Sequence, residues 1–233
     1  MVPAAAFHPR QWTGIFRKLF RAPEFSAQKY WEVRHAAMAG TLAAVGHAQL
    51  SETANQEQYC VKRDRIRNAL LRHVPSPPGC RLLDAGCGVG ELTKLYVELG
   101  FEVTGVDFTE TAINTARQAG IAADFQHAAL ERLSLGRCFD VVCVIDVLQH
   151  LVDDEAFACA VGALGRHVRM DSLAVVVDSM VEQDVCATHC RRRSLTRHEA
   201  EFRIAGLEII AHEQFVLTHE NATKDLVVLQ RRF

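Results

Sequence analysis

The 233-residue sequence lacks the features that mark several classes of protein. No apolar run approaches the roughly 18 residues of a membrane-spanning helix, and no charged start with a long apolar stretch and small-residue cleavage site indicates a secretory signal. Neither charge sign dominates, because 26 Lys and Arg stand against 28 Asp and Glu. No overall field therefore favours a nucleic acid as partner. We expect a cytoplasmic globular protein with no membrane span, no internal repeat and no nucleic-acid partner.

Cysteine is also too sparse for a disulfide scaffold, since eight residues are spread over the whole chain. Cys87 and Cys143 lie in apolar or glycine-rich surroundings and are predicted to be small buried residues of a reducing compartment. Residues 186–190, Cys-Ala-Thr-His-Cys, place two thiols beside an imidazole, but a closed zinc site needs a fourth ligand and no second cluster supplies it. We expect no metal, and a loop there that lines the substrate entrance. The three arginines at 191–193 either attract an anionic substrate group or form a solvated charge run.

The most informative stretch is residues 81–92, Arg-Leu-Leu-Asp-Ala-Gly-Cys-Gly-Val-Gly-Glu-Leu. A short apolar run ends in Asp84, glycines follow at alternate positions, and a helical pattern begins at once. Glycines at Gly86, Gly88 and Gly90 let the backbone turn sharply and approach a ligand. The helix that follows points its first free N–H groups at that ligand. The pattern predicts a nucleotide-type site at the carboxyl end of a parallel strand.

Two acids narrow the kind of ligand. A dinucleotide fingerprint would need glycine at the position of Glu91, and no G-x-x-x-x-G-K-[ST] phosphate loop is present. Asp84, ahead of the first glycine, suits a cationic group better than a phosphate. Asp107 closes the next apolar run, roughly twenty residues further on, where a carboxylate can accept hydrogen bonds from ribose hydroxyls.

Together these residues resemble the class I S-adenosylmethionine-dependent methyltransferases, with the glycine motif carried by residues 83–90. The resemblance covers about residue 59 to the C-terminus. It implies an α/β fold with a doubly wound, seven-stranded, mostly parallel sheet and an antiparallel last strand, and S-adenosylmethionine as cofactor. The implied cofactor-binding residues are Asp84, Ala85, Gly86, Cys87, Gly88, Asp107, Phe108, Ala129, Leu130 and Ile145.

The chain departs from the family pattern in the turn after the third strand. That turn usually carries an acid facing the adenine amino group, whereas Ala129 occupies the aligned position here. Adenine recognition would then rest on the backbone N–H of Leu130 and on apolar stacking. Asp124 comes too early to replace the acid; Glu131 is either a substitute or a solvent-facing residue.

The remaining pattern predicts alternating helices and strands. Thr109 and Asp153 are the expected caps of the second and third helices of the methyltransferase domain. The last two strands read as an antiparallel pair joined by a polar link at 218–224. The predicted helices cover residues 91–99, 110–119, 153–166 and 196–205. One predicted strand ends at residue 107, and later strands cover residues 123–127, 139–145, 173–178, 207–214 and 226–231.

The N-terminal part, residues 1–74, is predicted as a helical extension or lid, and a Pro-rich break at 75–79 separates it from a methyltransferase domain at 75–233. Within it, residues 12–20 have one apolar and one basic helix face. Such a helix binds a membrane surface, acts as a targeting segment, or packs on the domain over the cofactor or a subunit contact. We favour packing. The family resemblance makes Tyr30, Arg34 and Tyr59 candidate substrate-binding residues, as part of a lid.

His150 is the candidate catalytic residue. It follows the apolar run 139–145, in the segment that passes the sulfonium and substrate in the resembled family, where histidine is frequent. It is either a general base, because its pKa lies near working pH, or a wall of the cofactor pocket.

The predicted function is in-line methyl transfer to oxygen or nitrogen of a small-molecule acceptor. Two alternatives remain: a protein or peptide N-methyltransferase, and a non-catalytic S-adenosylmethionine-binding regulatory partner. A homodimer is a candidate assembly.

Overall fold

A computed structural model describes residues 26–38 and 41–233. The predicted amphipathic helix at 12–20 lies outside these residues. The strands are β1 (Arg81–Ala85), β2 (Glu102–Asp107), β3 (Ala123–His127), β4 (Phe139–Ile145), β5 (Val168–Asp178), β6 (Val185–Ala187), β7 (Cys190–Arg192), β8 (Leu207–Leu217) and β9 (Ala222–Arg231). The helices are α2 (Ala27–Ala37), α3 (Glu52–His73), α4 (Glu91–Glu98), α5 (Glu110–Gln118), α6 (Asp154–His167), α7 (Leu195–Ile204) and the short 3₁₀ turns η2 (Leu42–Ala44), η3 (Leu130–Arg132) and η4 (Leu148–His150).

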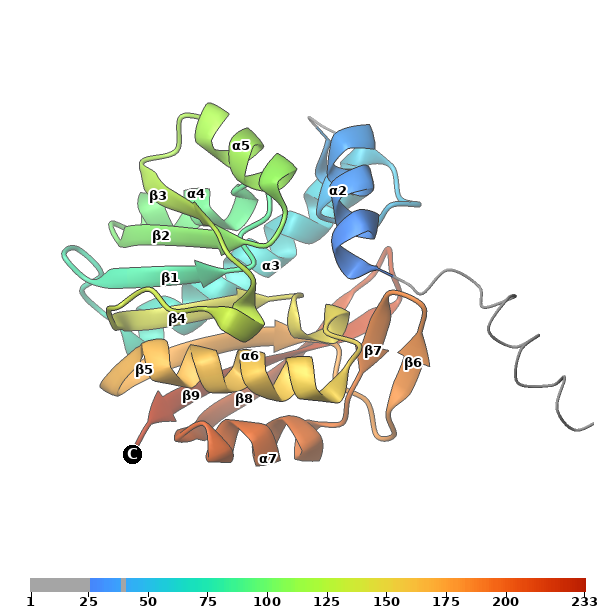
Figure 1. Cartoon of the computed structure of the whole chain (residues 1–233). Helices are drawn as coiled ribbons and strands as arrows, with labels where there is room; N and C mark the ends of the chain where they lie inside the picture. Colours follow the sequence, from blue (N-terminus) through green and yellow to red (C-terminus); the bar gives the residue numbers. More distant parts are fainter. Residues whose placement is uncertain (1–25, 39–40) are drawn as a thin grey trace, which may run out of the picture.

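The described part of the chain forms one seven-stranded sheet in the order β3-β2-β1-β4-β5-β9-β8, together with the separate β6–β7 hairpin (Figure 1). Strands β1 to β5 are parallel, and β9 is antiparallel to both of its neighbours. This confirms the predicted mostly parallel sheet. The strand order reverses between β1 and β4, and ligands of such sheets bind at the carboxyl ends of the strands flanking that point.

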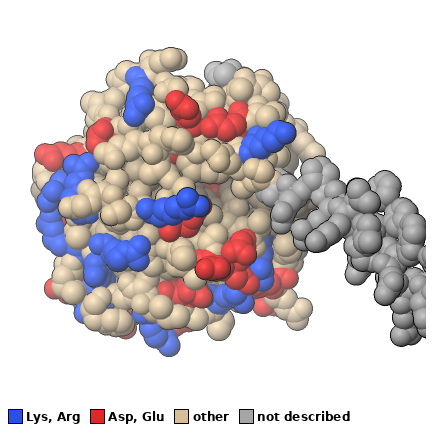
Figure 2. Space-filling view, viewed as in Figure 1, with Lys and Arg blue, Asp and Glu red and all other residues tan. Residues whose placement is uncertain are grey.

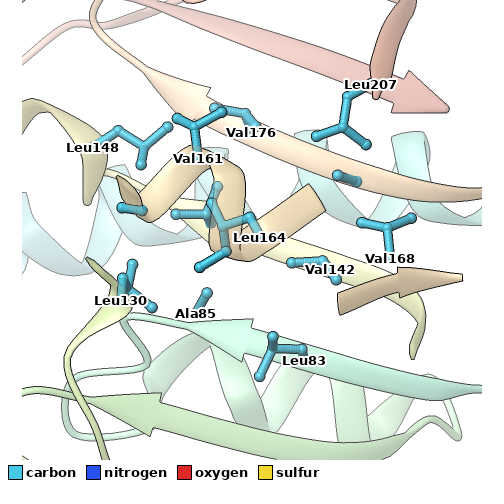
Figure 3. Packing of buried hydrophobic residues seen from close by; sticks show 14 of the residues in the cluster. Leu83, Ala85, Leu130, Val142, Leu148, Val161, Leu164, Val168, Val176 and Leu207 are labelled. Atoms are coloured by element: carbon cyan, nitrogen blue, oxygen red, sulfur yellow. The ribbon is translucent and has the colours of Figure 1, made fainter. Parts of the chain in front are cut away.

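Two cores sandwich the sheet, because neighbouring residues of a strand point to opposite faces. Leu82 and Val141 pack in the core that includes α3 and α4, whereas Leu83 and Val142 pack in the core that includes α6 and α7. Figure 3 shows the second core, with Leu164 of α6 among the strand side chains. The central strands therefore need continuous apolar runs, and this is the pattern that the sequence has.

The start of α5 is capped from another part of the chain. Thr109 occupies the predicted cap position, but its hydroxyl donates to Asp107 at 2.7 Å and makes no cap hydrogen bond. Instead Glu32 of α2 accepts from the backbone N–H groups of Glu110 and Thr111 at 2.8 and 3.3 Å. This contact fastens α2 over the carboxyl edge of the sheet (Figure 1). The predicted cap of α6 is confirmed, since Asp153 accepts from the N–H of Ala156 at 2.9 Å.

Three boundaries differ from the sequence prediction. Strand β5 begins at Val168, five residues early, because it continues past a register shift opposite β4. The predicted polar link at 218–224 shortens to the turn between β8 and β9, where Asn221 adopts a φ of 47°. Residues 185–192, expected as a loop, form the β6–β7 hairpin.

None of the helices in the described ranges has both the length and the apolar character required to traverse a bilayer. On the face seen in Figure 2, Lys and Arg side chains lie among Asp and Glu side chains, so charges of both signs occur across it. The division at residues 74 and 75 stays a prediction. In the structure, Ile66 and Leu70 of α3 belong to the same core as β1.

Candidate active site

A cavity of about 660 Å³ lies at the carboxyl ends of β1, β2 and β4. Helix α2 and the β6–β7 hairpin contribute further walls. The sequence-predicted residues that line it are Tyr30, Arg34, Tyr59, Asp84, Gly86, Cys87, Gly88, Asp107, Phe108, Leu130, Ile145 and His150. Ala85 and Ala129 do not line it: Ala85 is fully buried in the core of the sheet, and Ala129 precedes η3.

The glycine turn brings backbone into the cavity wall. Gly86, Gly88 and Gly90 have φ values of 83°, 52° and 89°, a region that side chains disfavour. A Cβ at Gly88 would also lie 2.8 Å from Val45 Cγ1. Glycine is therefore required both for the turn and for the close approach of the neighbouring segment.

Asp107 is fixed at the end of β2 by three hydrogen bonds. Its Oδ2 accepts from the N–H of Gly88 at 3.0 Å, and its Oδ1 accepts from the N–H and hydroxyl of Thr109 at 2.9 and 2.7 Å. A carboxylate has about four acceptor sites, so capacity remains for a ligand. The group is oriented, almost buried and part of the cavity lining, which fits the ribose hydroxyls of the expected cofactor.

Asp84 offers a second carboxylate nearer the sheet. Burial raises its pKa to about 7, the hydroxyl of Thr93 at 2.6 Å opposes the rise, and the charge of Asp107 adds to it. A cationic ligand group in the cavity would stabilise the ionised form. The residues present thus fit S-adenosylmethionine, which is cationic at sulfur and carries a ribose.

The turn after β3, which the sequence predicts to face the adenine, contributes an acid to the cavity. Leu130, Glu131 and Phe108 all line the cavity. Asp124 is an exposed partner of Arg137 at 3.3 Å and lines a different, shallow pocket. Glu131 is thus the acid of this turn that reaches the cavity.

His150 ends η4 with its Nδ1 3.0 Å from the backbone carbonyl oxygen of His189. A carbonyl only accepts, so we assign the proton of the neutral ring to Nδ1, which leaves the lone pair on Nε2. Burial lowers the pKa of His150, and the bond to His189 works against that shift. The ring is therefore neutral at neutral pH and has the protonation state of a general base.

Aromatic side chains of α2 close over this histidine. The ring of Trp31 meets that of His150 edge-on at 4.8 Å between centroids, and Tyr30 stacks on the ring of His189 at 5.1 Å. Arg34 lines the cavity, but its guanidinium lies 4.8 Å from the Trp31 ring centroid and donates to the carbonyls of Ala43 and Gly46. Those contacts give Arg34 a role in holding the segment between α2 and α3.

Sequence reasoning missed a buried cluster of three charged groups. Asp146 accepts from Lys62 at 2.8 Å and also from Lys224 at 2.5 Å. Burial opposes ionisation of Asp146, but the two ammonium groups hold its pKa well below the usual range. Asp146 directly follows β4 and has a φ of 57°, whereas the lysines lie 84 residues before it and 78 after it. Only the proximity of Asp146 to His150 could have drawn attention to it in the sequence.

The segment at residues 186–193 combines the two thiols and the imidazole with three arginines. In the described residues, no group of three or more His, Cys, Asp and Glu side chains could hold a metal ion. Arg191 and Arg193 pair with Asp154 at 3.0 and 3.1 Å. Arg192 of β7, together with Cys190, lines the cavity.

Known proteins resemble this chain in sequence and in fold. Residues 83–170 match a family model described as a methyltransferase domain. A ubiquinone biosynthesis O-methyltransferase of Rhodopseudomonas palustris (strain BisB5) is 30% identical over 153 residues, which make up 58% of this chain and 60% of that protein. The chain thus spans less than two thirds of the length of that relative.

Solved structures extend the likeness to nearly the whole chain. Magnesium protoporphyrin IX methyltransferase of Synechocystis PCC 6803, with bound S-adenosylmethionine, has a TM-score of 0.71 at 16% identity, covering 91% of this chain and all of that one. The 1,6-didemethyltoxoflavin-N1-methyltransferase of Burkholderia thailandensis has a TM-score of 0.60 at 16% identity, covering 100% of this chain and 94% of that one. Residues 83–170 thus carry a methyltransferase domain, and the chain shares the fold of S-adenosylmethionine-dependent methyltransferases almost end to end.

Proposed function

We propose that this protein transfers the methyl group of S-adenosylmethionine to a hydroxyl oxygen of a small molecule. The observation that carries the proposal is His150, whose Nδ1 is bonded to the His189 carbonyl and whose Nε2 is the basic nitrogen, in the wall of the cavity. A hydroxyl acceptor must lose a proton on methylation, and a neutral imidazole can accept it.

The residues divide the work between donor and acceptor. When bound, S-adenosylmethionine supplies a methyl group already activated on sulfur. Asp107 would accept hydrogen bonds from the ribose, and Asp84 would favour the cationic end. Nε2 of His150 would take the acceptor proton. Trp31 and Tyr30 exclude water from this end of the cavity and hold the acceptor near the methyl group, where orientation contributes most to the rate.

Two observations support a small acceptor with oxygen as the methylated atom. The cavity volume falls in the range of roughly 300–1,000 Å³ that is typical of small-molecule sites, and α2 and the β6–β7 hairpin both wall it. The Rhodopseudomonas palustris relative bears the name of an O-methyltransferase. A peptide acceptor would need an open groove instead.

The test supplies ¹³C-methyl-labelled S-adenosylmethionine with a deproteinised metabolite extract or with the protein fraction of the same extract. We expect label in small molecules, at the chemical shift of a methyl ether and not of a methylamine. Label confined to the protein fraction would favour the peptide alternative. Donor binding by calorimetry without any transferred label would favour the non-catalytic alternative.

A further inference from the structure

Three cationic side chains from separate elements line the cavity near the segment after β4. They are Lys62 of α3, Arg192 of β7 and Lys224 of β9, and Asp146 and Glu220 line the cavity as well. Glu220 already faces the amide of Gln58. The acids that suit the cationic donor, Asp84 and Asp107, lie on β1 and β2. Cationic and acidic groups of the cavity wall therefore come from different elements.

The two lysines are buried more deeply than charged groups usually are. Their side chains are 6% and 5% exposed, and they share a single carboxylate, that of Asp146. An ammonium group has three N–H donors. In the described part of the chain, each Nζ makes one hydrogen bond, to Asp146, and Nζ of Lys62 also lies 4.7 Å from the Tyr59 ring centroid. Donors and charge both remain available on the cavity side.

An unneutralised buried charge is costly, and an anion that pairs with it removes that cost. Arg192 adds to the positive potential beside Lys224. Burial raises the pKa of the Cys190 thiol, and the charges of Arg192 and Lys224 both oppose that rise. We propose that Lys62, Asp146 and Lys224 form a subsite that binds a carboxylate of the ligand in the cavity. Asp146 sets the spacing of the two ammonium groups, and the lysines donate to the bound carboxylate. This inference rests on the proposed function, because it assigns one end of the same site.

Two ligands of a methyltransferase could bring a carboxylate here: the methionine part of the donor, or the acceptor. Calorimetry distinguishes them without turnover. In the donor arm, S-adenosylhomocysteine is compared with 5′-methylthioadenosine, which lacks the amino acid group. In the acceptor arm, protein saturated with S-adenosylhomocysteine is titrated with benzoate and with benzamide, a neutral molecule of the same shape.

The variants are Lys62→Met and Lys224→Met, each of which leaves a balanced pair on Asp146. Arg67→Met is the control, because it removes a charge from the same helix in an exposed pair with Asp64. If the donor carboxylate binds here, both lysine variants weaken S-adenosylhomocysteine about tenfold or more and leave 5′-methylthioadenosine unchanged, as expected for loss of a charged hydrogen bond. If the acceptor carboxylate binds here, the wild-type complex prefers benzoate and both variants lose that preference.

The proposal is overturned if, in folded lysine variants, the donor analogues and the benzoate and benzamide titrations all match those of Arg67→Met. Thermal unfolding verifies that the variants are folded. The proposed function fails in a different way, namely through wild-type protein that does not bind S-adenosylhomocysteine or transfers no label. The two outcomes are thus distinguishable.

Discussion

The backbone carbonyl of His189 lies 3.0 Å from Nδ1 of His150, so the β6–β7 hairpin holds the imidazole that follows β4. One hydrogen bond fixes both the orientation of the ring and the nitrogen that carries its proton. Because the bond comes from the main chain, substitution of the His189 side chain would leave it in place. The candidate base is thereby positioned by an element far from it in the sequence.

The first prediction concerns this imidazole. His150→Ala should lower turnover about 10²–10⁴-fold, the usual contribution of a general base, with little change in donor affinity. Burial lowers the pKa of His150, so the acid limb of wild-type activity should lie below the ordinary histidine value of about 6.5. Activity falls as the pH drops through that pKa, because the protonated ring cannot accept a proton. Steady-state kinetics over a pH series measures both effects.

His219→Ala is the control, since this exposed histidine pairs with Glu57 outside the catalytic machinery. It should retain the wild-type profile. A turnover of His150→Ala within a few-fold of wild type, with the acid limb still present, would make His150 a wall of the pocket only.

The second prediction concerns Asp107. Asp107→Ala removes the carboxylate expected to accept from the ribose, at a cost of about 1.5–3 kcal/mol in donor affinity. Asp124→Ala should have no effect, because that acid forms an exposed pair with Arg137 away from the cavity. Calorimetric titration with S-adenosylhomocysteine measures both variants. Equal dissociation constants for folded Asp107→Ala and wild type would remove the ribose assignment.

The third prediction separates backbone strain from collision in the glycine turn. Gly88→Ala combines a φ of 52° with a Cβ 2.8 Å from Val45, whereas Gly120 has a φ of 68° and open space around it. Gly120→Ala should therefore show only the left-handed backbone cost of roughly 1–2 kcal/mol in unfolding free energy. Gly88→Ala should lose more unfolding free energy than Gly120→Ala and should also bind the donor less tightly. Urea unfolding and calorimetry give the two quantities.

Val45→Ala removes the atom that a new side chain at Gly88 would meet. Added to Gly88→Ala, it should recover part of the lost donor affinity. If the double variant binds no better than the single one, the collision is not the cause of the defect.

The fourth prediction uses the buried charge cluster as a probe of stability. Asp146→Asn leaves two buried ammonium groups without their shared carboxylate, and losing one partner of a buried pair costs about 3–5 kcal/mol. Lys224→Met leaves Lys62 paired with Asp146, so its loss should be smaller. Urea unfolding at neutral pH gives both free energies. A larger loss of unfolding free energy for Lys224→Met than for Asp146→Asn would contradict this account of the paired and unpaired buried charges.

The pH dependence follows from the lowered pKa of Asp146. A carboxyl with a depressed folded pKa stabilises the protein fully above its unfolded pKa of about 3.9. That stabilisation is lost as the pH falls from there toward the folded pKa. The difference in unfolding free energy between wild type and Asp146→Asn should accordingly be constant above about pH 5 and shrink below about pH 4.

The sequence predicted best what depends on neighbouring residues. The strand, glycine turn and helix at 81–92 are specified locally by apolar residues, left-handed glycines and a helical pattern, and the structure has β1, the turn and α4 there. Asp107 was found because its distance from the glycines follows from the length of one helix and one strand. These features need no knowledge of the rest of the chain.

Long-range contacts could not be predicted from one sequence. Lys62 is one of several charged residues of α3, and Lys224 falls in the predicted polar link at 218–224, so nothing in the local sequence connects either lysine to Asp146. The predicted cap of α5 was wrong for the same reason. Thr109 has a suitable residue type, but its hydroxyl donates to Asp107, and the helix N-terminus is capped by Glu32, which lies 78 residues before Glu110. The start of β5 was missed because Arg169 and Asp171 are polar within a strand that continues past an irregularity.

The attachment of α2 through Glu32 has a consequence for how such a protein diverges from its relatives. The walls near the donor come from the sheet and its turns, whereas Tyr30, Trp31 and the hairpin belong to segments that pack against the sheet from outside. Under the proposed function, substitutions in those outer segments would change which molecule is accepted while the donor site keeps its shape. Related proteins could thus acquire new acceptors through changes in α2 and the β6–β7 hairpin alone, while they inherit the same donor site.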